Sequence, residues 1–203
     1  MKKGLAFLSL GLTVMIPAPA QTQEVTDEVL IAQASAAAPA SYRAGAEVRA
    51  YGEDGSLWTV REGTNELICL ADRPGDEGFA SACYHVSLEP FMQRGRELSA
   101  EGITGQDRQL ARWAEVDEGK IPMPDGAAMV YNLRGQAADF DSHTLYLTDA
   151  QHIHAAYIPF ATPESTGLSA EPNQGGPWIM MPGRPSAHIM FSFKGEAEAA
   201  HEH

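Results

Sequence analysis

Apolar and polar residues alternate at every second position in two separate parts of the chain, a period that predicts β-strands. The first part holds candidate strands at residues 48–50, 57–59, 67–70 and 79–85. The second part holds candidates at 129–133, 144–147, 152–158, 178–181 and 188–193. The tetrapeptide EDGS at 53–56 is typical of a β-hairpin loop, and residues 61–65 make a second turn. The first three strands are therefore predicted to form a meander.

Between the two groups of strands, the apolar period changes to that of a helix. Leu88, Phe91 and Leu98 recur at helical spacing after Ser87, which is a favourable N-cap residue. Pro90 falls in the first turn, where its missing N–H costs nothing. We therefore expect a first helix at about residues 88–98.

A second helix is predicted to begin near Thr104, with Asp107 as the partner in a weak capping box. Its apolar spacing predicts that it buries Leu110, Trp113 and Val116. Strands, two central helices and further strands predict an α+β fold with a mostly antiparallel β-sheet. The folded region, residues 42–194, has a length that suits a single domain with one core.

The two ends of the chain have the composition of segments outside the folded domain. Residues 1–20 combine two lysines, an apolar stretch and a small-x-small cleavage site, which predicts a signal peptide and a periplasmic or secreted protein. The apolar stretch is too short to span a bilayer, so no retained membrane anchor is expected. Residues 21–41 are predicted to form a flexible N-terminal tether, and residues 195–203 a disordered acidic tail.

The net charge of the chain limits the classes of partner that it is expected to bind. It has 27 acidic and 14 basic residues, a formal charge of −13, which becomes −15 once the two lysines of the signal peptide are removed. Nucleic acids and anionic membranes bind to clustered Lys and Arg side chains, and the chain has no basic run. Nucleic acid is therefore excluded as a predicted partner.

Two cysteines, Cys69 and Cys83, are the only ones in the chain. In an oxidising compartment an isolated pair of this spacing favours a structural disulfide, which stabilises the fold by about 3 kcal/mol. A redox or metal-thiolate pair would require a C-x-x-C spacing that the chain lacks.

The histidines form the strongest candidate constellation. His152 and His154 are two residues apart in a predicted strand, so both imidazoles would lie on one face, and His188 opens the last strand. If these strands are neighbours, a three-histidine site becomes possible, with His143 or an acidic residue as a further ligand. Such a site could hold zinc, copper or iron, and the nearby methionines Met180, Met181 and Met190 would favour copper.

The alternative for each histidine is a half-buried residue that donates one N–H to a backbone carbonyl. The H-x-H strand followed by a later histidine is similar to the pattern of the cupin family. Two departures stand against that similarity, because residues 155–160 contain no glutamate and two central helices do not suit a compact barrel.

Two longer stretches, together with His152-Ile153-His154, resemble a group of exported bacterial proteins without an assigned activity. They are REGTN at 61–65 followed by Cys69 and Asp72, and GGPW at 175–178 leading to AHIM at 187–190. The resemblance covers most of residues 42–194. It implies a common fold and supplies no site residues.

The leading hypothesis is an exported protein that binds a small ligand or partner through the sheet face carrying His152, His154 and His188, with catalysis left open. Trp178, Tyr157 and Arg184 are the candidate ligand-binding residues. Residues 161–177 form a long loop that could cover the site. The competing hypothesis is a metal-dependent enzyme at the same face. A serine hydrolase is disfavoured because no G-x-S-x-G motif occurs.

Overall fold

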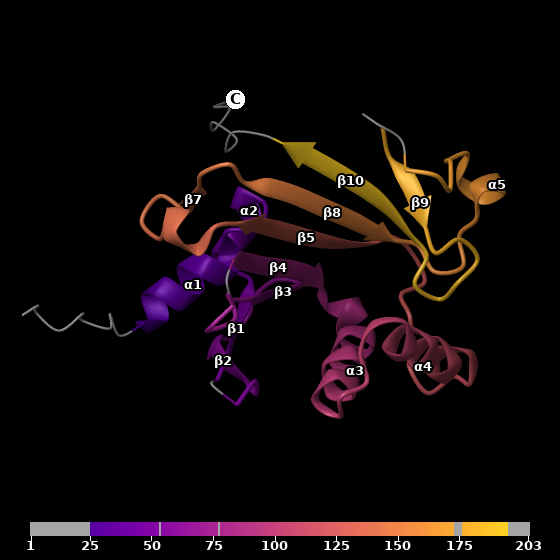
Figure 1. Ribbon diagram of the computed structural model, residues 1–203, viewed down its shortest axis with the longest axis horizontal. Coiled ribbons are helices and arrows are strands. Elements are labelled where there is room, and N and C mark those ends of the chain that lie inside the picture. Colours follow the sequence, from indigo (N-terminus) through magenta and orange to yellow (C-terminus); the bar gives the residue numbers. More distant parts are fainter. Residues whose placement is uncertain (1–24, 53, 77, 173–175, 195–203) are drawn as a thin grey trace, which may run out of the picture.

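The computed structural model describes residues 25–52, 54–76, 78–172 and 176–194 (Figure 1). The predicted signal peptide, the first four residues of the predicted tether and the predicted acidic tail lie outside the described residues. Within these ranges, a mostly antiparallel sheet and five helices form an α+β fold, as the sequence predicts.

Eight strands form one open sheet in the order β2-β1-β3-β4-β5-β8-β10-β9. Their bounds are β1 Glu47–Tyr51, β2 Leu57–Arg61, β3 Leu67–Leu70, β4 Phe79–His85, β5 Ala128–Gly135, β8 Gln151–Tyr157, β9 Trp178–Met180 and β10 His188–Lys194. A second sheet pairs β6 Phe140–Asp141 with β7 Tyr146–Leu147.

The helices are α1 Asp27–Ser35, α2 Ala40–Arg43, α3 Glu89–Ala100, α4 Gly105–Asp117 and α5 Pro163–Thr166. Two short 3-10 turns, η1 Val86–Leu88 and η2 Ala137–Asp139, complete the elements. The loop predicted at 161–177 thus contains α5. Among the residues that the structure describes, no helix is long and apolar enough to cross a membrane.

The predicted meander is wrong in one respect. β1 and β2 form the expected antiparallel hairpin, but β3 pairs with the other side of β1 and runs parallel to it. The turn between β2 and β3 is held by the N–H groups of Thr64 and Asn65, which both donate to the carbonyl oxygen of Gly45. A side chain at Gly63 would lie 2.9 Å from Glu47, so the close approach of this turn to β1 requires glycine.

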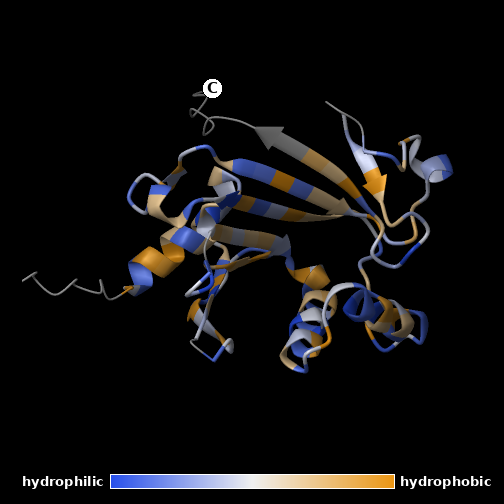
Figure 2. Ribbon diagram, viewed as in Figure 1, coloured by the Kyte–Doolittle hydropathy of each residue, from blue (hydrophilic) through white to orange (hydrophobic). Residues whose placement is uncertain are grey.

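The main sheet has two faces with separate cores. Cys69, Cys83 and Tyr131 lie on one face, called here the disulfide face. Ile68, Tyr84, Val130, Ala155 and Tyr157 lie on the other, called the α3 face because Leu88 and Met92 pack against it. Figure 2 shows the underlying alternation of hydrophilic and hydrophobic residues along β8.

Helix α1 covers the disulfide face, although its segment was expected to belong to a flexible tether (Figure 1). Ala34 is fully buried, and Leu30 and Ile31 pack against the same core. Its buried positions, Ala32, Ala34 and Ser35, are small residues that allow close packing on the sheet but give a weak amphipathic signal in the sequence.

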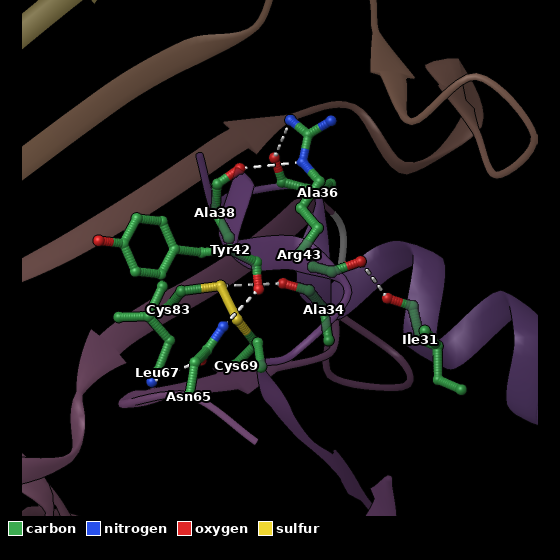
Figure 3. Close-up of a disulfide and its surroundings, with 12 residues drawn as sticks. Ile31, Ala34, Ala36, Ala38, Tyr42, Arg43, Asn65, Leu67, Cys69 and Cys83 are labelled. Atoms are coloured by element: carbon green, nitrogen blue, oxygen red, sulfur yellow. Dashed lines mark hydrogen bonds between the residues drawn. A yellow bond between two sulfur atoms is a disulfide. The ribbon is translucent and has the colours of Figure 1, made fainter. Parts of the chain in front are cut away.

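The disulfide between Cys69 and Cys83 is present as predicted and joins directly opposed residues of β3 and β4. Figure 3 shows its surroundings, where the Cys83 sulfur lies 3.3 Å from the carbonyl oxygen of Ala34. The Asn65 amide donates to the Tyr42 carbonyl oxygen nearby. The disulfide therefore ties the centre of the sheet beneath α1.

Helices α3 and α4 confirm the two predicted central helices, but their ends and faces differ in detail. Ser87 is not the N-cap of α3, because it lies within η1, whose N-cap is His85; the N-cap position of α3 is Leu88, which makes no side-chain capping bond. Thr104 is the N-cap of α4 but makes no side-chain capping bond, so the expected capping box is absent. Leu110, expected in the core, is 48% exposed, whereas Arg112 is only 9% exposed.

Candidate functional site

The sheet does not bring the three candidate histidines together. His154 lies opposite Tyr131, and His152 lies on the same disulfide face, with the two imidazole centroids 5.9 Å apart. His188 lies opposite Tyr157 on the α3 face. Because neighbouring side chains in a strand alternate between faces, the predicted site of three converging histidines does not form.

His143 is remote from this arrangement. It is exposed in the turn between β6 and β7, where its backbone N–H donates to a carboxylate oxygen of Asp141. Within the described part of the chain, no group of three or more His, Cys, Asp or Glu side chains could hold a metal ion.

Two arginines of α4 lie together under the α3 face instead. Arg108 and Arg112 are one helical turn apart, and the pKa of Arg112 is lowered mainly by burial and further by the charge of Arg108. Neither guanidinium forms an ion pair with a described carboxylate, while the Glu115 carboxylate, on the same helix, binds Arg94 of α3. Gln109 and Trp113, also on α4, donate hydrogen bonds to Ser186. We call Arg108, Arg112, Gln109, Trp113 and Ser186 the arginine cluster.

The Arg112 guanidinium has more donors than described acceptors. It stacks on the Phe91 ring at 4.0 Å, donates to the Phe91 carbonyl oxygen at 3.4 Å and donates to Gln109 Oε1. Its buried Nε has no hydrogen-bond partner among the described residues, and the same holds for Nε of Arg108. A guanidinium carries five N–H donors, so capacity for an acceptor is left over.

Burial is the main electrostatic influence on Arg112. It lowers the pKa of the guanidinium to about 10, so the side chain stays protonated at neutral pH. A buried charge without a partner costs several kcal/mol. An anion bound here would offset this cost in a chain whose formal charge is −13.

Ser186 is the centre of a polar network that connects α4 to the start of β10. Its fully buried hydroxyl accepts from Gln109 Nε2 at 2.7 Å and from Trp113 Nε1 at 2.8 Å. Its carbonyl oxygen lies 2.7 Å from Nδ1 of His188. The segment before β10 therefore positions α4 and His188 together.

His188 stands in a defined protonation state. A carbonyl oxygen only accepts, so Nδ1 carries the proton and Nε2 is left as the acceptor of the neutral ring. Burial lowers the pKa of His188, although the bond to Ser186 opposes this shift. The imidazole stacks on the Tyr157 ring with centroids 4.9 Å apart. Burial in turn raises the pKa of Tyr157, which the Arg112 charge opposes.

The other predicted ligand-binding residues lie on or beside this region. The Arg184 guanidinium lies 5.2 Å above the Trp113 ring. Trp178 of β9 is half-buried opposite Met190, which places it on the α3 face with His188. Of the predicted residues, the structure thus gathers Tyr157, His188 and Arg184 around the arginine cluster.

Arg112 itself was missed by reading apolar periodicity, which assigned Leu110 to the core. The signal was available as two arginines four residues apart, since like charges at this spacing destabilise a helix unless something opposes them.

A separate groove of about 530 Å³ lies beside the start of α3 and is lined by His85, Ser87, Pro90, Pro122, Met123 and Asp125, among others. The Ser87 N–H and hydroxyl both lie within hydrogen-bond distance of His85 Nδ1. This pairing is accounted for by the N-cap that begins η1.

No protein-family model, curated protein or solved structure matches this chain.

Proposed function

We propose that this is an exported protein that binds a small organic anion at the arginine cluster. The observation that carries the proposal is the buried guanidinium of Arg112, adjacent to Arg108 and without a described carboxylate partner. A planar carboxylate matches the fork of guanidinium donors, which makes a carboxylic acid the favoured ligand class.

The surrounding groups support a ligand with a further polar atom. His188 stays neutral and offers Nε2 as an acceptor, so a hydroxyl or amine of the ligand is the matching partner. Export to the periplasm or outside the cell is part of the proposal. The disulfide supports it, because such bonds persist in oxidising compartments.

The test compares carboxylate binding by the wild type and by Arg112→Met. Melting temperatures are measured with sodium acetate and sodium succinate against sodium chloride at equal ionic strength. We expect the carboxylates to raise the melting temperature of the wild type, since a ligand that binds only the folded state stabilises it. Arg112→Met should lose this increase while remaining as stable without ligand, because an apolar side chain replaces an uncompensated buried charge.

Arg94→Met is the matched control, since it also removes one guanidinium from the two-helix unit, but one that is paired with Glu115. It should keep the carboxylate response. Equal responses of wild type and Arg112→Met, or no response of the wild type to either carboxylate, would contradict the proposal.

A further inference from the structure

The groove beside the start of α3 is a cavity separate from the arginine cluster. Its volume of about 530 Å³ falls within the range of about 300–1,000 Å³ that is typical of small-molecule sites. None of the residues that line it belongs to the arginine cluster. One wall is formed by His85, Val86, Ser87 and Pro90, and the other by residues 122–127.

Both walls of this groove are held in place by the fold. In the first wall, the Val86 N–H donates to the Glu66 carbonyl oxygen at 2.8 Å, which fixes η1 to the residue before β3. The second wall begins after the buried Ile121, and its Met123 packs against the core of the α3 face. Prolines, whose rings fix the backbone φ angle, contribute to both walls: Pro90, Pro122 and Pro124. The groove is therefore largely preformed, which lowers the entropy cost of binding a ligand.

The N-cap of η1 leaves two polar atoms in the first wall for a ligand. The Ser87 N–H donates to His85 Nδ1 at 3.2 Å, so Nδ1 is the acceptor of the neutral imidazole and Nε2 carries the proton. The Ser87 hydroxyl lies 2.8 Å from the same Nδ1, donates its proton there and keeps its oxygen lone pairs as acceptors. This wall thus has an acceptor at Ser87 Oγ and a donor at His85 Nε2.

Asp125 gives the groove a negative charge. Its carboxylate forms no ion pair with a cation of the described residues, and no described Lys or Arg lines the groove. Lys120, shortly before the second wall, is bound to Glu118, and Arg96 of α3 is bound to Glu89. The formal charge of the chain, −13, also favours a cationic ligand over an anionic one here.

The rest of the groove lining is mainly apolar. Its apolar side chains are Val86, Pro90, Pro122, Met123, Pro124 and Ala127. Val86 is 40% exposed, so a ligand that covers it removes apolar surface from water. Apolar walls with a carboxylate and a hydroxyl acceptor suit a ligand that is both apolar and positively charged. A primary ammonium matches these groups, because it carries three N–H donors.

We propose that this groove binds a small apolar primary amine, with the ammonium group at the Asp125 carboxylate and the hydrocarbon part against Met123 and the prolines. The Asp125 carboxylate selects the charge of the ligand, and the apolar walls select its hydrocarbon part. The groove is distinct from the arginine cluster and takes a ligand of the opposite charge.

The experiment titrates isopentylammonium chloride into the isotope-labelled, full-length processed protein at neutral pH and follows the backbone amide signals by NMR. We expect the signals of Val86, Ser87 and Gly126 to shift and to give a dissociation constant. Methylammonium should bind at least about tenfold more weakly, because it lacks most of the hydrocarbon that would leave water. Isovalerate, which has a chain of the same shape and the opposite charge, should not shift these signals.

Asp125→Asn keeps the size of the side chain and removes its charge. It should weaken isopentylammonium binding by about two- to fivefold, as expected for the loss of an exposed ion pair. Asp107→Asn is the matched control, since it removes an exposed carboxylate of α4 that does not line the groove. It should keep the wild-type affinity. Arg112→Met should also keep this affinity, so failure of carboxylates to bind the arginine cluster would leave the amine site unaffected.

Four results would overturn the proposal. They are the absence of amide shifts at the groove, equal affinities for methylammonium and isopentylammonium, unchanged isopentylammonium affinity in Asp125→Asn, and groove shifts with isovalerate as large as those with the amine. A chain-length dependence together with weaker binding by Asp125→Asn supports it.

Discussion

His188 shows how much one hydrogen bond determines about a candidate site residue. The Ser186 carbonyl oxygen fixes the proton on Nδ1, and burial against Tyr157 disfavours the charged ring. Desolvation lowers the pKa of a histidine because it penalises only the protonated form. The neutral ring of His188 therefore has Nε2 as a hydrogen-bond acceptor.

The lowered pKa of His188 predicts a pH dependence of stability. An unfolded histidine titrates near pH 6.5, so below this pH the unfolded state binds more protons than the folded state. The free energy of unfolding should thus fall between pH 7.5 and pH 5.5, by at most about 1.4 kcal/mol per pH unit for one histidine. Urea denaturation at several pH values measures this slope.

His188→Asn keeps an amide donor for Ser186 and removes the titrating ring, so its slope should be smaller. Burial also lowers the pKa of His154, which leaves part of the slope in place. An unchanged slope in His188→Asn would contradict this account.

The sequence named His188, Tyr157 and Arg184 as candidates but predicted the wrong neighbours for His188. Strand alternation correctly placed His152 and His154 on one face. The face of His188 depends on its register with β8, which is set by the turn before β10 and its hydrogen bonds. That register could not be read from spacing along the chain.

Among the elements, the contact between α3 and α4 determines where Arg112 lies. A side chain at Gly95 of α3 would approach Nη1 of Arg112 to 2.8 Å. Glycine in a helix interior normally costs about 0.5–1 kcal/mol relative to alanine. Here it makes the space that lets the guanidinium lie between the helices.

The effect of Gly95→Ala on the free energy of unfolding should therefore have opposite signs in two backgrounds. In the wild type it should lower the free energy of unfolding, because the added methyl group displaces the buried guanidinium. In an Arg112→Ala background, Gly95→Ala should raise the free energy of unfolding by about 0.5–1 kcal/mol, the ordinary gain in helix propensity. A double-mutant cycle from urea denaturation gives the coupling, expected to be about 1–3 kcal/mol.

Gln93→Ala provides the comparison for this cycle, since Gln93 is exposed on α3 and bonds to Glu97. Its effect should add to that of Arg112→Ala. Additivity of Gly95→Ala as well would show that the glycine does not accommodate the guanidinium.

The helices also show what periodicity can and cannot predict. α3 and α4 were found because large apolar residues recur at helical spacing between clear breaks. α1 was not expected to fold because its buried positions are mostly alanines, which carry little apolar signal. The buried side of α4 was misassigned because Arg112, not Leu110, faces the core.

The whole molecule is organised by one sheet with two unlike faces. The strand patterns predicted that the sheet is mostly antiparallel, and the two cysteines predicted its disulfide. The parallel pairing of β1 with β3 could not be predicted from the strand pattern, because it depends on the close turn at Gly63. The resemblance to exported bacterial proteins stays a prediction.

The disulfide predicts a stability difference that leaves the site intact. Replacing both Cys69 and Cys83 by alanine should lower the free energy of unfolding by about 3 kcal/mol, as expected for a closed loop of this length. Denaturation without reductant measures the loss. Acetate affinity should stay unchanged, because the disulfide and Arg112 lie on opposite sides of the sheet. A large drop in acetate affinity would show that the two sides are coupled.

The layer that holds the sheet together is thus separate from the side of the sheet that carries the arginine cluster. Substitutions around Arg112 should change that side of the sheet without disturbing the layer in which α1 covers the disulfide. Distant sites without shared partners change stability independently. One side of the sheet is thus free to diverge while the other keeps the architecture constant.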